Sequence, residues 1–131
     1  MTKKWWCLLW LGWILVITAV TTLPWSNFVS HSHWSSVRWI PLQDMKFSYD
    51  FFVDFSGNIL LFVPFGYMQF RSGLALPRRE LRSISIAALT LSLAAEFTQI
   101  YMHNRIASAT DVLCNVTGGI IGGFVGLLKL F

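Results

Sequence analysis

The chain has 131 residues, of which 55% are hydrophobic and 12% are charged, with a formal net charge of +4. Soluble domains average about 25% charged residues, so this composition is typical of a membrane protein. A bundle of membrane helices would use nearly the whole chain, so we expect no separate soluble catalytic domain. The basic residues do not gather into the patch that marks a nucleic-acid interface, so we expect the lipid bilayer and no nucleic acid as a partner.

Four apolar stretches are long enough to form helices that cross a membrane, which takes about 20 residues. We therefore predict an all-α fold, an integral membrane four-helix bundle that forms one domain over residues 1–131. The predicted spans cover about residues 5–23, 54–70, 84–102 and 111–129. The first span follows two lysines, as a signal peptide does. It is longer than the apolar core of about 7–15 residues usual in signal peptides, so we expect it to be retained.

The distribution of basic residues predicts the orientation of the spans. Seven of them fall on the side that carries both chain ends: Lys3, Lys4, Arg71, Arg78, Arg79, Arg82 and Lys129. The other three fall on the opposite side: Arg38, Lys46 and Arg105. Because cytoplasmic loops carry an excess of Lys and Arg, we expect both termini in the cytoplasm.

The longest connection, residues 24–53, is unusually rich in aromatic side chains. We expect part of it to lie in the membrane interface as a short amphipathic helix, serving either as an anchor or as a platform for a lipid substrate. It contains His31 and His33, which would point apart on a helix. No third ligand is evident in the sequence, so we expect no metal site and no cofactor.

Three polar pairs interrupt the apolar stretches: Asp54 with Asn58, Glu96 with Gln99, and Asp111 with Asn115. Residues three or four apart share one face of a helix, so the members of each pair point together. In the four-span arrangement all three pairs reach the outer side, where Arg105 is the only nearby strong cation. Carboxylates and amides are costly in hydrocarbon, so these seven residues form a predicted ligand-binding site.

An architectural role is the main alternative for these residues. Asp54 and Asp111, or Thr110, would cap helices, while amides would join the helices and Glu96 would pair with Arg105. Glu96 fits this reading least. It lies inside an apolar stretch, where it has to be paired, protonated or facing water. If there is catalysis, Glu96, Asp54 and Asp111 are the candidate acid and base, because the sequence shows no nucleophile triad or metal set.

The last span contains three overlapping G-x-x-x-G pairs, a pattern typical of tightly packed membrane helices. The predicted packing residues are Gly118, Gly119, Gly122, Gly123 and Gly126. The pattern leaves open whether the partner helix belongs to this chain, to a second copy or to another membrane protein.

At the polar residues the chain resembles the VanZ-like family of small bacterial membrane proteins, over about residues 50–126. Residues 54–66 match the family pattern D-x-x-x-N-x-x-x-F-x-P-x-G, and residues 96–99 match its E-x-x-Q. Residues 111–118 match D-x-x-x-N-x-x-G, and Arg105 precedes them. The resemblance implies a multi-pass protein of the bacterial cytoplasmic membrane that belongs to the cell envelope. The family's named member is associated with resistance to teicoplanin-type glycopeptides, and the family has no agreed molecular activity.

Three functions are compatible with these observations. The protein binds or modifies a lipid-linked or anionic envelope component near the outer membrane face, or it is a small transporter or flippase. The third reading is an accessory subunit that docks on a membrane-protein partner, or on a second copy of itself, through its glycine-rich helix. A transporter needs a polar path to the inner face, whereas the sequence places polar groups on the outer side only.

Overall fold

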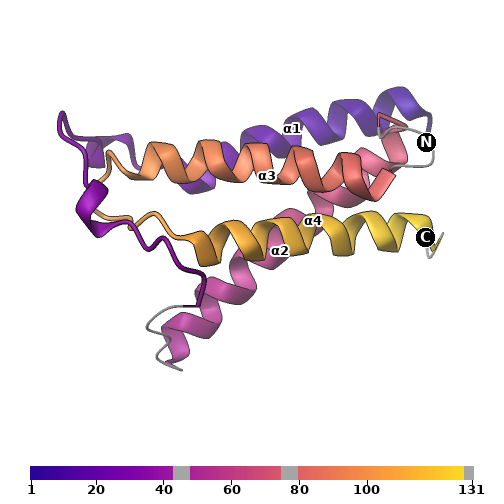
Figure 1. The fold of residues 1–131 in the computed structure, drawn as a ribbon. Helices are drawn as coiled ribbons and strands as arrows, with labels where there is room; N and C mark the ends of the chain where they lie inside the picture. Colours follow the sequence, from indigo (N-terminus) through magenta and orange to yellow (C-terminus); the bar gives the residue numbers. More distant parts are fainter. Residues whose placement is uncertain (43–47, 75–79, 129–131) are drawn as a thin grey trace.

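The structure is a computed structural model that describes residues 1–42, 48–74 and 80–128 (Figure 1). Over these residues the chain is all-helical, and four α-helices are each long and apolar enough to cross a membrane. The predicted all-α, four-span fold is therefore confirmed. The helices are α1 (Lys3–Thr22), α2 (Tyr49–Ser72), α3 (Glu80–Gln99) and α4 (Ala109–Leu127).

The helices pack as a bundle in which α4 contacts both α2 and α3, and α1 packs mainly on α2. Ile17, Phe62, Phe65 and Ala88 form a buried core between α1, α2 and α3. The beginning of α1 and the end of α4 lie at one end of the bundle (Figure 1). We call the opposite end, where α1 and α3 end and α4 begins, the loop end.

The helices begin earlier than the apolar stretches predicted. Helix α2 begins at Tyr49 rather than at 54, because Ser48 Oγ accepts a hydrogen bond of 3.2 Å from the Phe51 N–H. Ser108 Oγ likewise accepts from the Thr110 N–H, 3.2 Å away, at the start of α4. Serine is a favoured N-cap because its hydroxyl satisfies a free N–H of the first turn.

The predicted helix caps Asp54, Asp111 and Thr110 are therefore wrong. Ser48 caps α2 and Ser108 caps α4 instead. Four of the basic residues used to predict the orientation lie outside the described residues: Lys46, Arg78, Arg79 and Lys129.

The connection between α1 and α2 does not contain the expected amphipathic helix in its described part. It contains two three-residue 3-10 helices, η1 (Trp25–Asn27) and η2 (Trp34–Ser36). Backbone hydrogen bonds tie it to the connection between α3 and α4: Val29 N–H to the Tyr101 carbonyl at 2.9 Å, and Arg38 N–H to the Ala107 carbonyl at 3.0 Å. The two connections therefore close the loop end together.

The glycines of α4 face helices of the same chain. A Cβ added at Gly118 or Gly122 would overlap backbone carbonyl groups of α2, and one at Gly119 or Gly123 would collide with side chains of α3. Gly126 also faces α2. Because only a hydrogen fits at these positions, α4 lies closer to its neighbours than an ordinary helix can. Within this structure the glycine surface is filled intramolecularly.

Candidate functional site

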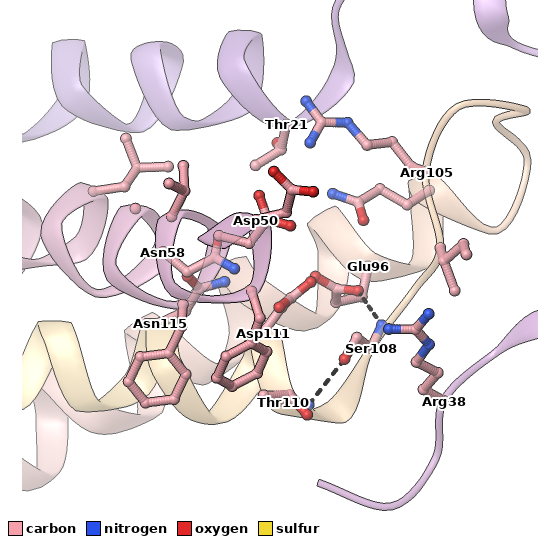
Figure 2. A pocket seen from close by; sticks show the side chains of 18 of the residues that line it. Thr21, Arg38, Asp50, Asn58, Glu96, Arg105, Ser108, Thr110, Asp111 and Asn115 are labelled. Carbon is pink, nitrogen blue, oxygen red and sulfur yellow. Dashed lines mark hydrogen bonds between the residues drawn. The ribbon is translucent and has the colours of Figure 1, made fainter. Parts of the chain in front are cut away.

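A polar cavity of about 870 Å³ lies at the loop end of the bundle (Figure 2). All four helices, α1 through Val20 and Thr21, and both connections contribute to its walls. All seven residues of the predicted site line it: Asp54, Asn58, Glu96, Gln99, Arg105, Asp111 and Asn115. The structure thus brings together residues that are up to 61 positions apart (54 to 115) in the sequence. Their role in ligand binding stays a prediction.

The cavity has a buried floor and an exposed rim. Glu96, Gln99 and Asn115 are buried, whereas Asp54 and Arg105 are exposed. This gradient follows from depth in the bundle, since the floor residues lie among packed helices and the rim residues sit near helix ends. The entrance therefore presents Asp54 and Arg105, and the floor presents the Glu96 carboxyl group with the amides of Gln99 and Asn115.

Asp111 of α4 faces α2 across the cavity. Its carboxylate lies close enough to the Asn58 side chain and to Asp54 for both to act on it electrostatically. Arg38 and Arg105 are also near enough to interact favourably with it. Asp111 therefore has polar and charged neighbours from α2 and from both connections.

Glu96 is held by the backbone rather than by a direct ion pair. Its Oε2 accepts a hydrogen bond of 2.7 Å from the Ser108 N–H (Figure 2). Arg105 instead donates from Nη2 to the Val20 carbonyl oxygen, 3.2 Å away. That carbonyl belongs to the last turn of α1, where carbonyl groups lack partners within the helix. Arg105 thus has an architectural contact as well as a place on the cavity rim.

One polar atom of the Asn115 side chain is bonded within the described part of the bundle and the other is not. Its Nδ2 donates to the Ser92 Oγ at 2.9 Å, which joins α4 to α3 as the architectural reading expected. Its Oδ1 is buried and makes no hydrogen bond with any of the described residues, although the residue is only 2% exposed. A buried acceptor without a donor costs about 1–3 kcal/mol, so this oxygen is suited to accept a hydrogen bond from a ligand or water in the cavity.

Two further charged residues that the sequence did not point to line the cavity. Arg38 comes from the connection after α1, and Asp50 comes from the first turn of α2. From the sequence, Arg105 was predicted to be the only cation near the site, and Arg38 was counted only as a loop charge. The structure corrects this prediction, because both arginines line the cavity. No local pattern marks Arg38. It reaches the cavity because the Arg38 N–H and carbonyl bond to the backbones of Ala107 and Ala109, at 3.0 and 2.9 Å.

An apolar groove of about 650 Å³ adjoins the polar cavity. Its walls are the outer faces of α3 and α4 and the aromatic part of the connection after α1, including Trp34, Trp39, Leu93, Phe97 and Leu113. The Trp34 and Trp39 rings are stacked with their centroids 6.1 Å apart. Arg38, Glu96 and Ser108 line both spaces, so the groove and the cavity are neighbours.

Comparison with known proteins gives one family match. A family model described as VanZ/LLP1 matches residues 6–130, which is most of the chain. No curated protein and no solved structure matches the chain.

Proposed function

Because this chain belongs to the VanZ/LLP1 family and its four α-helices are suited to crossing a membrane, we propose that it binds a lipid-linked anionic component of the cell envelope. The head group of this ligand occupies the polar cavity, and its hydrocarbon chain occupies the apolar groove. The protein resides in the bacterial cytoplasmic membrane with the loop end facing outward. The observation that carries the proposal is the contact between a charged cavity and an apolar groove through three shared residues.

Two arginines favour an anionic group at the cavity rim. Arg38 and Arg105 both line the cavity, and guanidinium groups bind phosphate or carboxylate through paired hydrogen bonds. The cavity also contains four carboxylates, from Asp50, Asp54, Glu96 and Asp111, so it is not a simple anion site.

Carboxylate and amide oxygens accept hydrogen bonds from hydroxyl groups, whereas carboxylates repel a second anion. A ligand that carries both a phosphate and hydroxyl groups, such as a phosphate-linked sugar on a lipid, satisfies both parts of the lining.

The groove favours a ligand with a hydrocarbon chain. Leu93, Phe97 and Trp39 are exposed by 52%, 54% and 67%, so the groove opens on the outer surface of the bundle. Burying apolar surface of this kind stabilises a bound chain by about 25 cal/mol per Å² in water, and in a bilayer it selects chains by shape. A head group in the cavity leaves its tail beside this surface.

Binding accounts for the arrangement better than transport or docking. Along α2 the polar cavity gives way to the apolar core around Phe62 and Phe65, so the described residues offer no polar path to the other end. The glycine face that a partner protein would use is filled by α2 and α3. Acid–base catalysis by Glu96 with Asp54 or Asp111 would be a second step on the same bound ligand, and binding is its prerequisite.

The test uses a phosphate-bearing prenyl lipid and the corresponding prenyl alcohol. The purified protein is placed in phosphatidylcholine nanodiscs, and each lipid is titrated while bound lipid is measured by native mass spectrometry. A hydrogen bond to a charged group contributes about 1.5–3 kcal/mol, so we expect the phosphate form to bind about ten- to hundredfold more tightly.

Arg38→Gln should remove most of this preference. Arg82→Gln is the matched control, because Arg82 is an exposed arginine of α3 that does not line the cavity. Equal binding of the two lipids, or equal effects of the two substitutions, would show that the polar residues serve the architecture of the bundle instead.

A further inference from the structure

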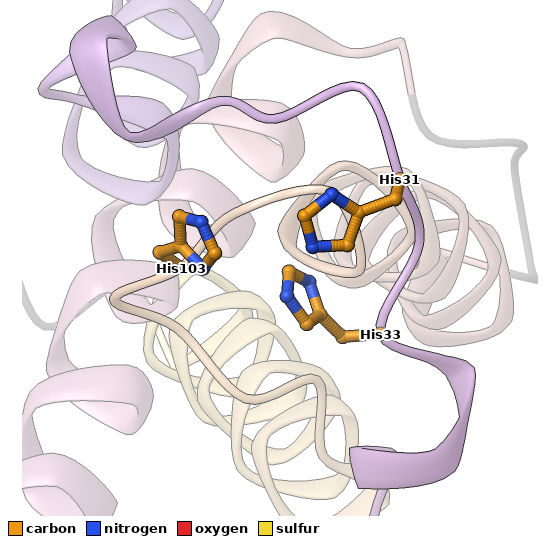
Figure 3. A group of neighbouring side chains, drawn as sticks. All are labelled: His31, His33 and His103. Atoms are coloured by element: carbon orange, nitrogen blue, oxygen red, sulfur yellow. The ribbon is translucent and has the colours of Figure 1, made fainter.

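The three histidines of the chain meet at one point of the loop end (Figure 3). His31 and His33 come from the connection after α1, and His103 comes from the connection after α3. Their ring centroids lie 4.9, 5.2 and 5.5 Å apart, and each offers a ring nitrogen such that the three nitrogens all lie within 4.8 Å of one another. We propose that these three imidazoles bind a divalent transition-metal ion of the zinc type.

The sequence predicted the opposite arrangement for two of them. His31 and His33 were expected to diverge on a helix, and no third ligand was evident. The segment from His31 to His33 is not helical, and the third ligand comes from a residue 70 positions beyond His33. The chain folds so that its entire histidine content converges, which sequence spacing does not indicate.

The spacing suits a zinc ion with only small side-chain movements. Three nitrogens at about 2.0–2.1 Å from a tetrahedral zinc lie about 3.4 Å from one another. The present nitrogens are within 4.8 Å, so rotations about the side-chain bonds bring them into range. Three imidazole ligands leave a fourth coordination position for water or a ligand from solution.

Backbone hydrogen bonds fix two of the three histidines. The His33 N–H donates to the Ile100 carbonyl at 2.8 Å, and the His103 N–H donates to the Asn27 carbonyl at 3.1 Å. These bonds join the two connections that supply the ligands. Metal binding therefore has to order little of the backbone that carries these ligands, because the fold already holds it in place.

One histidine also has the outer contact that metal ligands usually have. His33 Nδ1 lies 3.1 Å from the Ile100 carbonyl oxygen, which can only accept a hydrogen bond. With the hydrogen on Nδ1, the ring donates to this carbonyl and the lone pair of Nε2 is left for a metal. A ligating imidazole commonly donates its other N–H to a carbonyl or carboxylate in this way, which fixes the ring and raises its basicity.

The ligands are accessible to ions from solution, because His31 and His103 are exposed and His33 is partly buried. None of the three lines the polar cavity. The metal site is therefore independent of the proposed lipid-binding function, and either can fail alone.

The experiment measures zinc binding to the complete chain in detergent, purified with a tag that contains no histidine. Cys7 and Cys114 are first replaced by serine, so that thiols do not compete. We expect one zinc per chain, and X-ray absorption should show nitrogen and oxygen neighbours. Cobalt(II) in place of zinc should give the visible absorption of a four-coordinate site. Because these readings use the intact histidines, they do not depend on whether the histidine variants fold.

Single substitutions His31→Ala, His33→Ala and His103→Ala should each weaken zinc binding at least tenfold. Ser32→Ala, an exposed position between two of the ligands, should leave it unchanged. No zinc binding above that of the triple alanine variant, or histidine variants that bind as tightly as Ser32→Ala, would overturn the proposal.

Discussion

At the scale of single residues, Ser108 connects the parts of the candidate site. Its hydroxyl caps α4, and its N–H donates to Glu96 of α3 at 2.7 Å. It also lies beside Arg38 in an isolated β-bridge between the two connections. The Glu96 side chain is thus positioned by a backbone N–H. A side chain of the same shape that keeps an oxygen acceptor can replace it without moving the helices.

This arrangement predicts that Glu96→Gln separates function from folding. Glutamine keeps an oxygen for the Ser108 N–H but removes the charge, so the amount of inserted protein should stay near that of the wild type. In a strain in which the gene gives an envelope phenotype, activity should fall at least tenfold. Asp111→Asn and Arg105→Lys should behave in the same way. Activity that follows the amount of membrane-inserted protein would instead assign these residues to the architecture.

The hydrogen bond between Ser92 and Asn115 belongs to the architecture, and its loss should lower stability. Ser92→Ala leaves the buried Nδ2 of Asn115 without its acceptor. Hydrogen bonds between membrane helices contribute about 0.6 kcal/mol and at most about 1.7 kcal/mol, so we expect a loss of this size in the free energy of unfolding in detergent. Ser85→Ala is the matched control, because Ser85 bonds only to Leu81 within α3. Equal losses would mean that the interhelical bond contributes nothing.

The sequence predicted seven residues of the site because carboxylates and amides at helical spacing stand out in apolar stretches. It did not predict Arg38, which reaches the cavity through a non-helical connection whose path depends on distant backbone contacts. It also left a direct pair between Glu96 and Arg105 open. The structure assigns each of these a backbone partner instead, and such partners depend on loop geometry that spacing does not encode.

At the scale of helices, the close approach of α4 to α2 is the main packing feature of α4. The positions of Gly118 and Gly122 lie against the backbone carbonyl groups of Ile59 and Val63. Small residues at such contacts let backbones approach and gain dispersion contacts that larger side chains prevent. The helix is thus held by shape, and the polar residues at its beginning are positioned by that fit.

Gly122→Ala should therefore destabilise the bundle. The added methyl group would overlap the Val63 carbonyl group, and overpacking of this kind costs about 1–3 kcal/mol. Thermal unfolding of the purified protein in detergent measures the effect. Gly12→Ala in α1 is the control, because a Cβ there meets nothing within 4 Å. A Gly122→Ala variant as stable as the control would contradict the close approach of α4 and α2.

Helix boundaries were less predictable than helix number. Hydropathy marks the part of a helix that suits hydrocarbon, whereas a helix continues as far as its caps and hydrogen bonds allow. Helix α2 therefore includes five residues (49–53) before the predicted span, and its N-cap is Ser48. Asp50 was predicted to lie in the connection before α2. In the structure it lies in the first turn of α2 and lines the cavity.

At the scale of the whole molecule, α1 begins and α4 ends at the end of the bundle opposite the loop end (Figure 1). The proposed orientation places that end in the cytoplasm. In a background without Cys7 and Cys114, Ser26→Cys should react with a membrane-impermeant thiol reagent in intact cells. Thr2→Cys should react only after the membrane is opened. Both positions are exposed in the structure, so the opposite pattern would reverse the orientation.

The apolar groove lies on the outer surface of α3 and α4, so its occupancy by a lipid depends on the composition of the membrane. A ligand that enters from the side never leaves the plane of the bilayer, so its supply is set by its mole fraction among the lipids and not by its concentration in water. Confinement to that thin layer raises the effective concentration of even a minor lipid to the millimolar range. A site that looks weak in a dilute detergent titration can therefore be largely filled in the membrane.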